Sequence, residues 1–166
     1  MPYTFTSESV SEGHPDKICD QISDAVLDAC IDQDQNSRVA CEVLVKNNNV
    51  ILAGEITTQA NVDYEHIARK VVKEIGYDHE NLGFSYDSFT FYNYLSEQSN
   101  DIKEGIDLGD EIGSGDQGIM FVYACRETNE LMPLPIALAH KLTIKHSVIR
   151  RQQNSGLRPD AKSQVS

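Results

Sequence analysis

The 166-residue sequence is poor in basic residues, has no long apolar run and contains only four cysteines. Fourteen Lys and Arg against 26 Asp and Glu give a net charge of −12, which argues against general nucleic-acid binding. No apolar run approaches the roughly 18 residues of a membrane span. The N-terminus lacks the basic and apolar regions of a signal peptide. The cysteines form no Cys-x-x-Cys pair, so we expect reduced residues of a cytoplasmic protein.

Charge is distributed unevenly along the sequence. After residue 130 there are six Lys and Arg and one Asp, so this end carries +5 and the first 130 residues carry −17. The basic end is interpreted in one of two ways. It faces an anion or an acidic surface, or its charges lie on a solvated helix face.

The strongest local pattern predicts an amphipathic helix that begins at Pro15. Proline suits the first helical position because it lacks an N–H and its φ is already helical, which makes His14 the N-cap. One stripe at spacing four is apolar and predicts the buried face: Ile18, Ile22, Val26 and Cys30. A second stripe is acidic: Asp16, Asp20, Asp24 and Asp28. Like charges at this spacing repel, so this stripe is either a solvated face or has cations nearby, from another element or a metal.

The residues around the start of this helix predict an anion site. Gly13 lets backbone approach a ligand closely, and the N–H groups at a helix start attract phosphate. The carboxylate of Asp16 would repel phosphate unless Mg²⁺ bridges the two. His14 is therefore interpreted either as an ordinary helix cap or as a group that contacts a phosphate ligand.

Two segments rich in β-branched residues, 38–46 and 50–58, predict a β-hairpin around the three asparagines between them. Each segment carries one carboxylate among apolar neighbours, Glu42 in the first and Glu55 in the second. A carboxylate is costly to bury unless it is paired or binds something. Alternation along a strand also permits both side chains to point outward, so both interpretations stay open.

Further elements complete an α+β pattern. We predict a helix over 61–75 that stops at Gly76, a strand over 84–95, a helix over 135–152 and a strand beginning in the last residues. A strand there would have an unpaired edge, so we expect the chain to be cut short. The pattern predicts an α+β fold with a mixed or antiparallel sheet covered by helices on one face.

Residues 97–118 predict a functional loop, because they contain five glycines and seven acids. Gly113 to Gly118 match G-x-G-x-x-G, but we reject a dinucleotide site. That motif needs a helix after it, and the strand-like residues 119–124 follow instead. The glycines are expected to let the loop turn tightly at a ligand and present Asp116 there.

Several motifs together resemble the N-terminal portion of the S-adenosylmethionine synthetase (methionine adenosyltransferase) family. They are, in order, FTSESVSEGHPDKI at 5–18, DQISDAVLD at 20–28, GEITT at 54–58, GDQG at 115–118 and RPDAKSQ at 158–164. The resemblance implies the first part of a fold of three similar domains with pseudo-threefold symmetry. It divides the chain into an N-terminal domain at 1–96, a mobile active-site loop at 97–118 and the start of a central domain at 119–166.

The resemblance also implies a reaction. In the family, the methionine sulfur attacks C5′ of ATP and expels triphosphate, which is hydrolysed to phosphate and pyrophosphate, with Mg²⁺ and K⁺ as cofactors. By position, His14 resembles the triphosphate contact, Asp16 a Mg²⁺ ligand and Glu42 the K⁺ ligand. The remaining implied substrate contacts are Glu55, Gln98 and Asp116 for methionine, and Asp160, Ala161 and Lys162 for ATP.

The sequence departs from the family pattern in places. Asn100 stands where relatives usually have proline at the loop start, and Val122 replaces a usual glycine. Full members are more than twice as long and build each active site between two subunits, so we expect these residues to be inactive alone. The partners implied are ATP, L-methionine and further copies of the chain (a homodimer or homotetramer), with no nucleic acid or membrane. The alternative is a non-enzymatic binding or assembly module that keeps the subunit-pairing surface.

Overall fold

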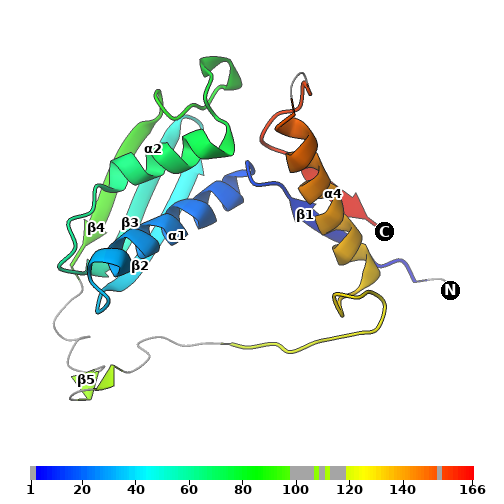
Figure 1. The fold of residues 1–166 in the computed structure, drawn as a ribbon, viewed down its shortest axis with the longest axis horizontal. Helices are drawn as coiled ribbons and strands as arrows, with labels where there is room; N and C mark the ends of the chain where they lie inside the picture. Colours follow the sequence, from blue (N-terminus) through cyan, green and yellow to red (C-terminus); the bar gives the residue numbers. More distant parts are fainter. Residues whose placement is uncertain (1–2, 98–106, 109–110, 113–118, 153–154) are drawn as a thin grey trace.

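A computed structural model describes the chain except residues 1–2, 98–106, 109–110, 113–118 and 153–154 (Figure 1). The helices are α1 (Pro15–Gln33), α2 (Tyr64–Ile75), a short 3₁₀ helix (Glu80–Leu82) and α4 (Leu134–Arg150). The strands are β1 (Ser7–Val10), β2 (Arg38–Lys46), β3 (Asn49–Thr57), β4 (Thr90–Ser96), β5 (Asp107–Leu108), β6 (Glu111–Ile112) and β7 (Lys162–Val165). Among these described residues, no helix combines the length and apolar character that a bilayer crossing requires.

Helix α1 forms as its sequence pattern predicts. His14 is the N-cap, Pro15 is the first helical residue, and the apolar stripe from Ile18 to Cys30 is buried. The carboxylates of the acidic stripe are all on exposed residues. Asp20 is paired with Lys17 of the same helix at 2.8 Å. The stripe is therefore a solvent-exposed face of the helix, and the cation paired with Asp20 belongs to the same helix.

The predicted hairpin is confirmed. Strands β2 and β3 pair antiparallel from Arg38↔Thr57 to Lys46↔Asn49, and Asn47 turns the chain with a positive φ of 54°. Strand β4 adds to β3 in parallel, which requires the crossover that α2 supplies. Helix α2 starts later than predicted, at Tyr64 with Asp63 as its cap, and ends at Gly76 in the left-handed conformation, as expected.

The strand predicted over 84–95 begins only at Thr90. Residues before it turn instead, with the N–H groups of Ser88 and Phe89 donating to the carbonyl of Ser85. Arg69 of α2 binds the carbonyls of Tyr86 and Phe89, which removes them from any strand ladder. The aromatic composition of this segment serves core packing rather than a longer strand.

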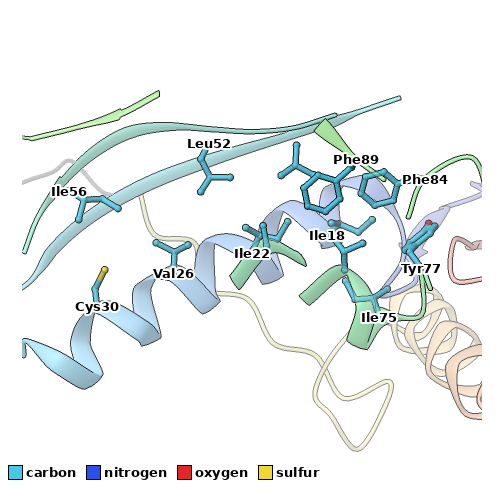
Figure 2. Close-up of a cluster of buried hydrophobic side chains, with 13 residues drawn as sticks. Ile18, Ile22, Val26, Cys30, Leu52, Ile56, Ile75, Tyr77, Phe84 and Phe89 are labelled. Atoms are coloured by element: carbon cyan, nitrogen blue, oxygen red, sulfur yellow. The ribbon is translucent and has the colours of Figure 1, made fainter. Parts of the chain in front are cut away.

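Helices α1 and α2 cover one face of the β2–β3–β4 sheet (Figure 1). Their apolar stripes meet the inward side chains of β3, including Leu52 and Ile56, in one buried cluster (Figure 2). Full burial of an aliphatic side chain of this size contributes about 1.5–3 kcal/mol. The opposite sheet face carries the exposed side chains of Leu44, Tyr92 and Tyr94. The predicted α+β fold with helices on one sheet face is confirmed.

The two ends of the chain form a second, smaller layer. Strand β1 pairs antiparallel with β7 from Ser7↔Val165 to Val10↔Lys162, and α4 packs on both (Figure 1). The strand expected at the end of the chain is therefore present, and β1 already pairs one of its edges. Residues 119–124 form no strand, contrary to prediction. They run extended with exposed side chains, because no described strand lies alongside to complete a ladder.

Candidate functional site

His14 lies at the start of α1 with its ring partly exposed. Its Nδ1 accepts a hydrogen bond from the backbone N–H of Asp16 at 3.2 Å, which is an N-cap interaction. An accepting Nδ1 places the proton of the neutral ring on Nε2, so Nε2 is the ring atom that can donate to a ligand. The side chain of Asp16 is 84% exposed, and its carboxylate lies 3.8 Å from Nδ1. The cap thus presents one donor and one carboxylate to solvent.

Ser11 joins the His14 turn to the segment that precedes β7. Its buried hydroxyl donates to the carbonyl of Pro159 at 2.7 Å and accepts the N–H of Ala161 at 2.8 Å. Its own N–H donates to the carbonyl of Ala161 at 2.8 Å. These three bonds hold together two segments that lie about 150 residues apart in sequence. The predicted ATP contacts His14 and Asp160–Lys162 are therefore brought to one corner of the protein.

Gly13 allows the close approach of these two segments. A Cβ atom added at this position would overlap the backbone and side chain of Pro159, and overlap with backbone cannot be relieved by a rotamer change. The carbonyl of Gly13 accepts a 2.6 Å hydrogen bond from the buried hydroxyl of Tyr77. Any side chain at residue 13 would push apart the turn and the segment that Ser11 joins.

Lys162 lies beside the same corner on an exposed strand position. Its Nζ is paired with Glu8 of β1 at 2.6 Å, and both side chains are about half exposed. An exposed pair of this kind is worth about 0–1 kcal/mol. A multiply charged anion could therefore displace Glu8 as the partner of Lys162 at little cost. Asp160 is exposed next to it, and Ala161 is held through its backbone by Ser11.

Glu12 anchors the corner to the end of α4. Its carboxylate accepts hydrogen bonds from Ser147, Arg150 and Arg151 at 2.9, 2.5 and 2.8 Å. Burial alone would raise the pKa of Glu12, but the hydrogen bonds from Arg151, Arg150 and Ser147 outweigh it and lower the pKa from 4.5 to about 2. Arg150 also donates to the carbonyl of Ile75 at the end of α2. Arg150 and Arg151 at the basic end of the chain therefore face an acid of the protein itself. This agrees with the interpretation that the basic end faces an anion or an acidic surface.

Sequence reasoning missed Ser11, Glu12, Tyr77 and Arg150. Ser11 and Glu12 lie in the same sequence motif as His14, so their place in that motif could have indicated a role at the site. Tyr77 and Arg150 carry no local signal, because their partners are 64 and 138 residues away. Such partners can be identified only from the three-dimensional structure.

Glu42 and Glu55 lie on the sheet face opposite the helices. Their pairing in the register, Glu42↔Ala53 and Ala40↔Glu55, places them on one side of neighbouring strands. This is the outward-facing alternative, with Glu42 exposed and Glu55 half-buried. Neither is hydrogen-bonded to His14 or Lys162 among the residues that the structure describes. The predicted methionine contacts Gln98 and Asp116 lie outside the described residues.

The described residues contain no group of three or more His, Cys, Asp or Glu side chains that could hold a metal ion by themselves. Asp16 is compatible with a different way of binding a metal ion, in which the substrate supplies some of the ligands. Mg²⁺ in nucleotide sites is held by one or two carboxylates together with substrate phosphates and waters, and Asp16 is an exposed carboxylate beside a helix N-terminus. Glu42 offers a single exposed oxygen donor group for K⁺.

These features define a class of protein. It is an α+β protein in which the start of a histidine-capped helix and the segment that carries Asp160 and Lys162 meet at one candidate anion-binding corner.

Comparison with known families narrows the class. Residues 2–100 match the family model described as "S-adenosylmethionine synthetase, N-terminal domain", and residues 111–166 match the "central domain" of the same enzyme. The chain belongs to the S-adenosylmethionine synthetase family.

Individual relatives agree with this assignment. The chain is similar to the S-adenosylmethionine synthase of Salinibacter ruber (55% identity, covering 100% of this chain and 44% of that protein). It is also similar to S-adenosylmethionine synthase 1 of Rhodopseudomonas palustris (56% identity, covering 99% and 43%). The chain thus spans less than half of the length of the curated relatives it matches.

Proposed function

We propose that this chain supplies the N-terminal part of an S-adenosylmethionine synthetase active site and binds the triphosphate of ATP at the His14 corner. The observation that carries the proposal is the Ser11 clamp, which joins the helix start at His14 to the segment with Asp160, Ala161 and Lys162. The motifs at 5–18 and 158–164 thereby lie next to each other. Helix N–H groups, an imidazole donor and a lysine together suit a polyphosphate.

In the proposed reaction a lone pair of the methionine sulfur forms the S–C5′ bond as the C5′–O bond of ATP breaks. The leaving oxygen takes the electron pair, and the triphosphate is then hydrolysed to phosphate and pyrophosphate. Nε2 of His14 would donate to the triphosphate near the breaking bond, and Lys162 would offset charge on it. Bound Mg²⁺ would neutralise further phosphate charge. Asp16 is the residue proposed to hold it.

The other substrate and the second ion are assigned to other residues of the chain. We assign Glu55, Gln98 and Asp116 to methionine, because a carboxylate such as Glu55 suits the substrate ammonium group. Glu42 is assigned to K⁺. Of these residues, Glu42 and Glu55 lie on the sheet face away from the helices, whereas His14 lies at the start of α1 on the helix side. A complete site in one place would therefore need a further copy of the chain, consistent with a homodimer or homotetramer.

The test uses a version of the chain extended to the full length of its relatives. His14→Asn removes the proposed donor to the leaving group, so turnover should fall roughly 10²- to 10³-fold. His79→Asn is a matched control, because His79 is an exposed histidine after α2. Turnover of His14→Asn equal to that of the control would reject the site. The 166-residue chain alone, given ATP, Mg²⁺, K⁺ and methionine, is expected to form no S-adenosylmethionine.

A non-enzymatic assembly module is the second candidate function. It is favoured by one observation, the exposed apolar side chains of Leu44, Tyr92 and Tyr94 on the uncovered sheet face. Sedimentation should then show a dimer of the 166-residue chain that Tyr94→Lys dissociates. If the chain also gives no heat with methionine or with Mg-tripolyphosphate in calorimetry, the assembly function is preferred. The free cysteines suit a cytoplasmic location for either function.

A further inference from the structure

We propose that Tyr77 is a positioning residue for His14, whose hydroxyl fixes the peptide plane that carries the histidine into the candidate anion site. This inference rests on the proposed function only for the identity of the ligand. The positioning of His14 by Tyr77 is a property of the chain without a ligand.

The peptide plane between Gly13 and His14 is held at both of its polar atoms. Its oxygen accepts the Tyr77 hydroxyl at 2.6 Å, and its N–H donates to the carbonyl of Ser11 at 3.1 Å. Because the peptide group is planar, these two bonds together resist rotation of the plane. Rotation would change the φ of His14, which the N-cap holds at −67°. The hydroxyl of Tyr77 therefore acts directly on the direction in which the His14 side chain leaves the backbone.

Tyr77 is itself held rigidly. Its ring packs edge-on against Phe84 with centroids 5.2 Å apart, and Phe84 stacks on Phe89. Its backbone N–H donates to the carbonyl of Val72, and its carbonyl accepts the N–H of Tyr86. A side chain fixed by the core of the sheet layer can transmit that rigidity to Gly13. The turn at Gly13 and His14 is thus anchored to the buried cluster of the sheet layer.

The contact lies where the two ATP-facing segments meet. Gly13 abuts Pro159, and the negative charge of Asp160 is close enough to influence Tyr77. Burial, together with this charge, raises the pKa of Tyr77 to about 12. The phenol therefore stays protonated and remains a donor throughout the neutral and moderately alkaline range. A donor that does not titrate is suited to a permanent positioning role.

The alternative is that the bond merely satisfies a buried carbonyl. Both readings predict some loss of stability when the hydroxyl is removed, since a hydrogen bond of this kind contributes modestly to folding. They differ in what happens at His14. A purely structural bond predicts no change in the His14 ring or in the affinity for a polyphosphate, once the altered chain is folded.

The test is Tyr77→Phe in the 166-residue chain, which removes only the oxygen. In NMR spectra without ligand, the amide and ring resonances of His14 should shift. In calorimetry, affinity for Mg-tripolyphosphate should fall roughly 3- to 10-fold, as expected for one lost positioning hydrogen bond. Tyr64→Phe is the matched control, because it removes a phenol oxygen at the opposite end of α2. Phe84→Leu loosens the ring packing and keeps the hydroxyl, so a smaller shift of the His14 resonances than in Tyr77→Phe is expected.

The outcomes separate the two proposals. His14 resonances and affinity unchanged in folded Tyr77→Phe, or changed equally in Tyr64→Phe, would overturn the positioning role. A wild-type chain that binds no Mg-tripolyphosphate would count against the proposed function, and the ligand-free NMR comparison would still decide the role of Tyr77. Should Tyr77→Phe not fold, 3-fluorotyrosine at position 77 keeps the donor and makes it more acidic. An unmoved His14 amide resonance in that variant would overturn the inference.

Discussion

The sheet layer and the terminal layer of this protein are held together by different forces. In the first, α1 and α2 bury a continuous apolar cluster against β2, β3 and β4 (Figure 2). In the second, the described contacts are rich in hydroxyl and charged groups. Oγ of Ser9 lies 2.8 Å from Nδ1 of His140, and the Ser163 hydroxyl donates to the carbonyl of Ala139. The carboxylate of Glu12 accepts a hydrogen bond from Ser147 near the end of α4. The candidate anion corner lies where the apolar layer meets the polar one.

The difference has a physical consequence. Apolar burial is non-directional, so it gives stability without fixing the angle between two parts. Hydrogen bonds are directional and weaker in net terms, so they fix geometry more than they add stability. The proposed triphosphate site needs His14 and Lys162 in fixed positions, and directional contacts of the second kind suit that need. Substitutions in the two layers should therefore differ in what they damage.

The largest expected effect comes from the apolar layer. Ile22 is 0% exposed in the centre of α1, so Ile22→Ala leaves a cavity and should cost about 2–5 kcal/mol in the free energy of unfolding. Leu142→Ala on α4 is the control, because Leu142 is 54% exposed. It should cost less than about 1 kcal/mol. Urea denaturation measures both, and equal losses would contradict the division into two kinds of layer.

An intermediate effect is expected from the charged link between the layers. Glu12→Gln leaves Arg150, whose side chain is 9% exposed, without its carboxylate. The loss should be about 1–3 kcal/mol, the range for a buried polar group that loses its partner. It should be accompanied by altered amide resonances at Gly13 and His14, since the link adjoins the turn. A loss of stability with no spectral change near residue 14 would show that the link does not order the site.

The same link predicts a pH dependence. The folded-state pKa of Glu12 is depressed to about 2 from 4.5, so its contribution is fully present above about pH 4.5. This contribution to stability is lost as the pH falls from about 4.5 towards 2. In that range the unfolded chain binds a proton at Glu12 and the folded chain does not. The stability difference between wild type and Glu12→Gln should therefore shrink over the same range. A difference that stays constant from pH 6 to 2.5 would contradict the assignment.

The two layers also differ in how far the sequence predicts them. Helix α1 and the β2–β3 hairpin follow from local patterns, the apolar spacing from Ile18 to Cys30 and the turn at Asn47. The strand predicted over 84–95 begins only at Thr90, because Arg69 of α2 binds the carbonyls of Tyr86 and Phe89. For the site, the motif around His14 located the corner, and the family resemblance supplied Asp160 and Lys162. Tyr77 could not be found this way, because its role depends on a contact 64 residues away.

The smallest effect is expected from the exposed pair of Glu8 and Lys162. Glu8→Gln removes an ion pair of 2.6 Å between half-exposed side chains, so stability should change by less than about 1 kcal/mol at low salt. Added salt at about 1 M shortens the screening length to roughly 3 Å and should abolish most of that difference. The partly buried link between Glu12 and Arg150 should keep more of its effect in the same salt, because salt screens buried pairs much less. Two carboxylates four residues apart in one motif would then differ in strength through burial and through the number of hydrogen bonds that each accepts. Equal salt sensitivity of Glu8→Gln and Glu12→Gln would mean that solvent reaches both pairs, and that the corner is not ordered by its buried polar contacts.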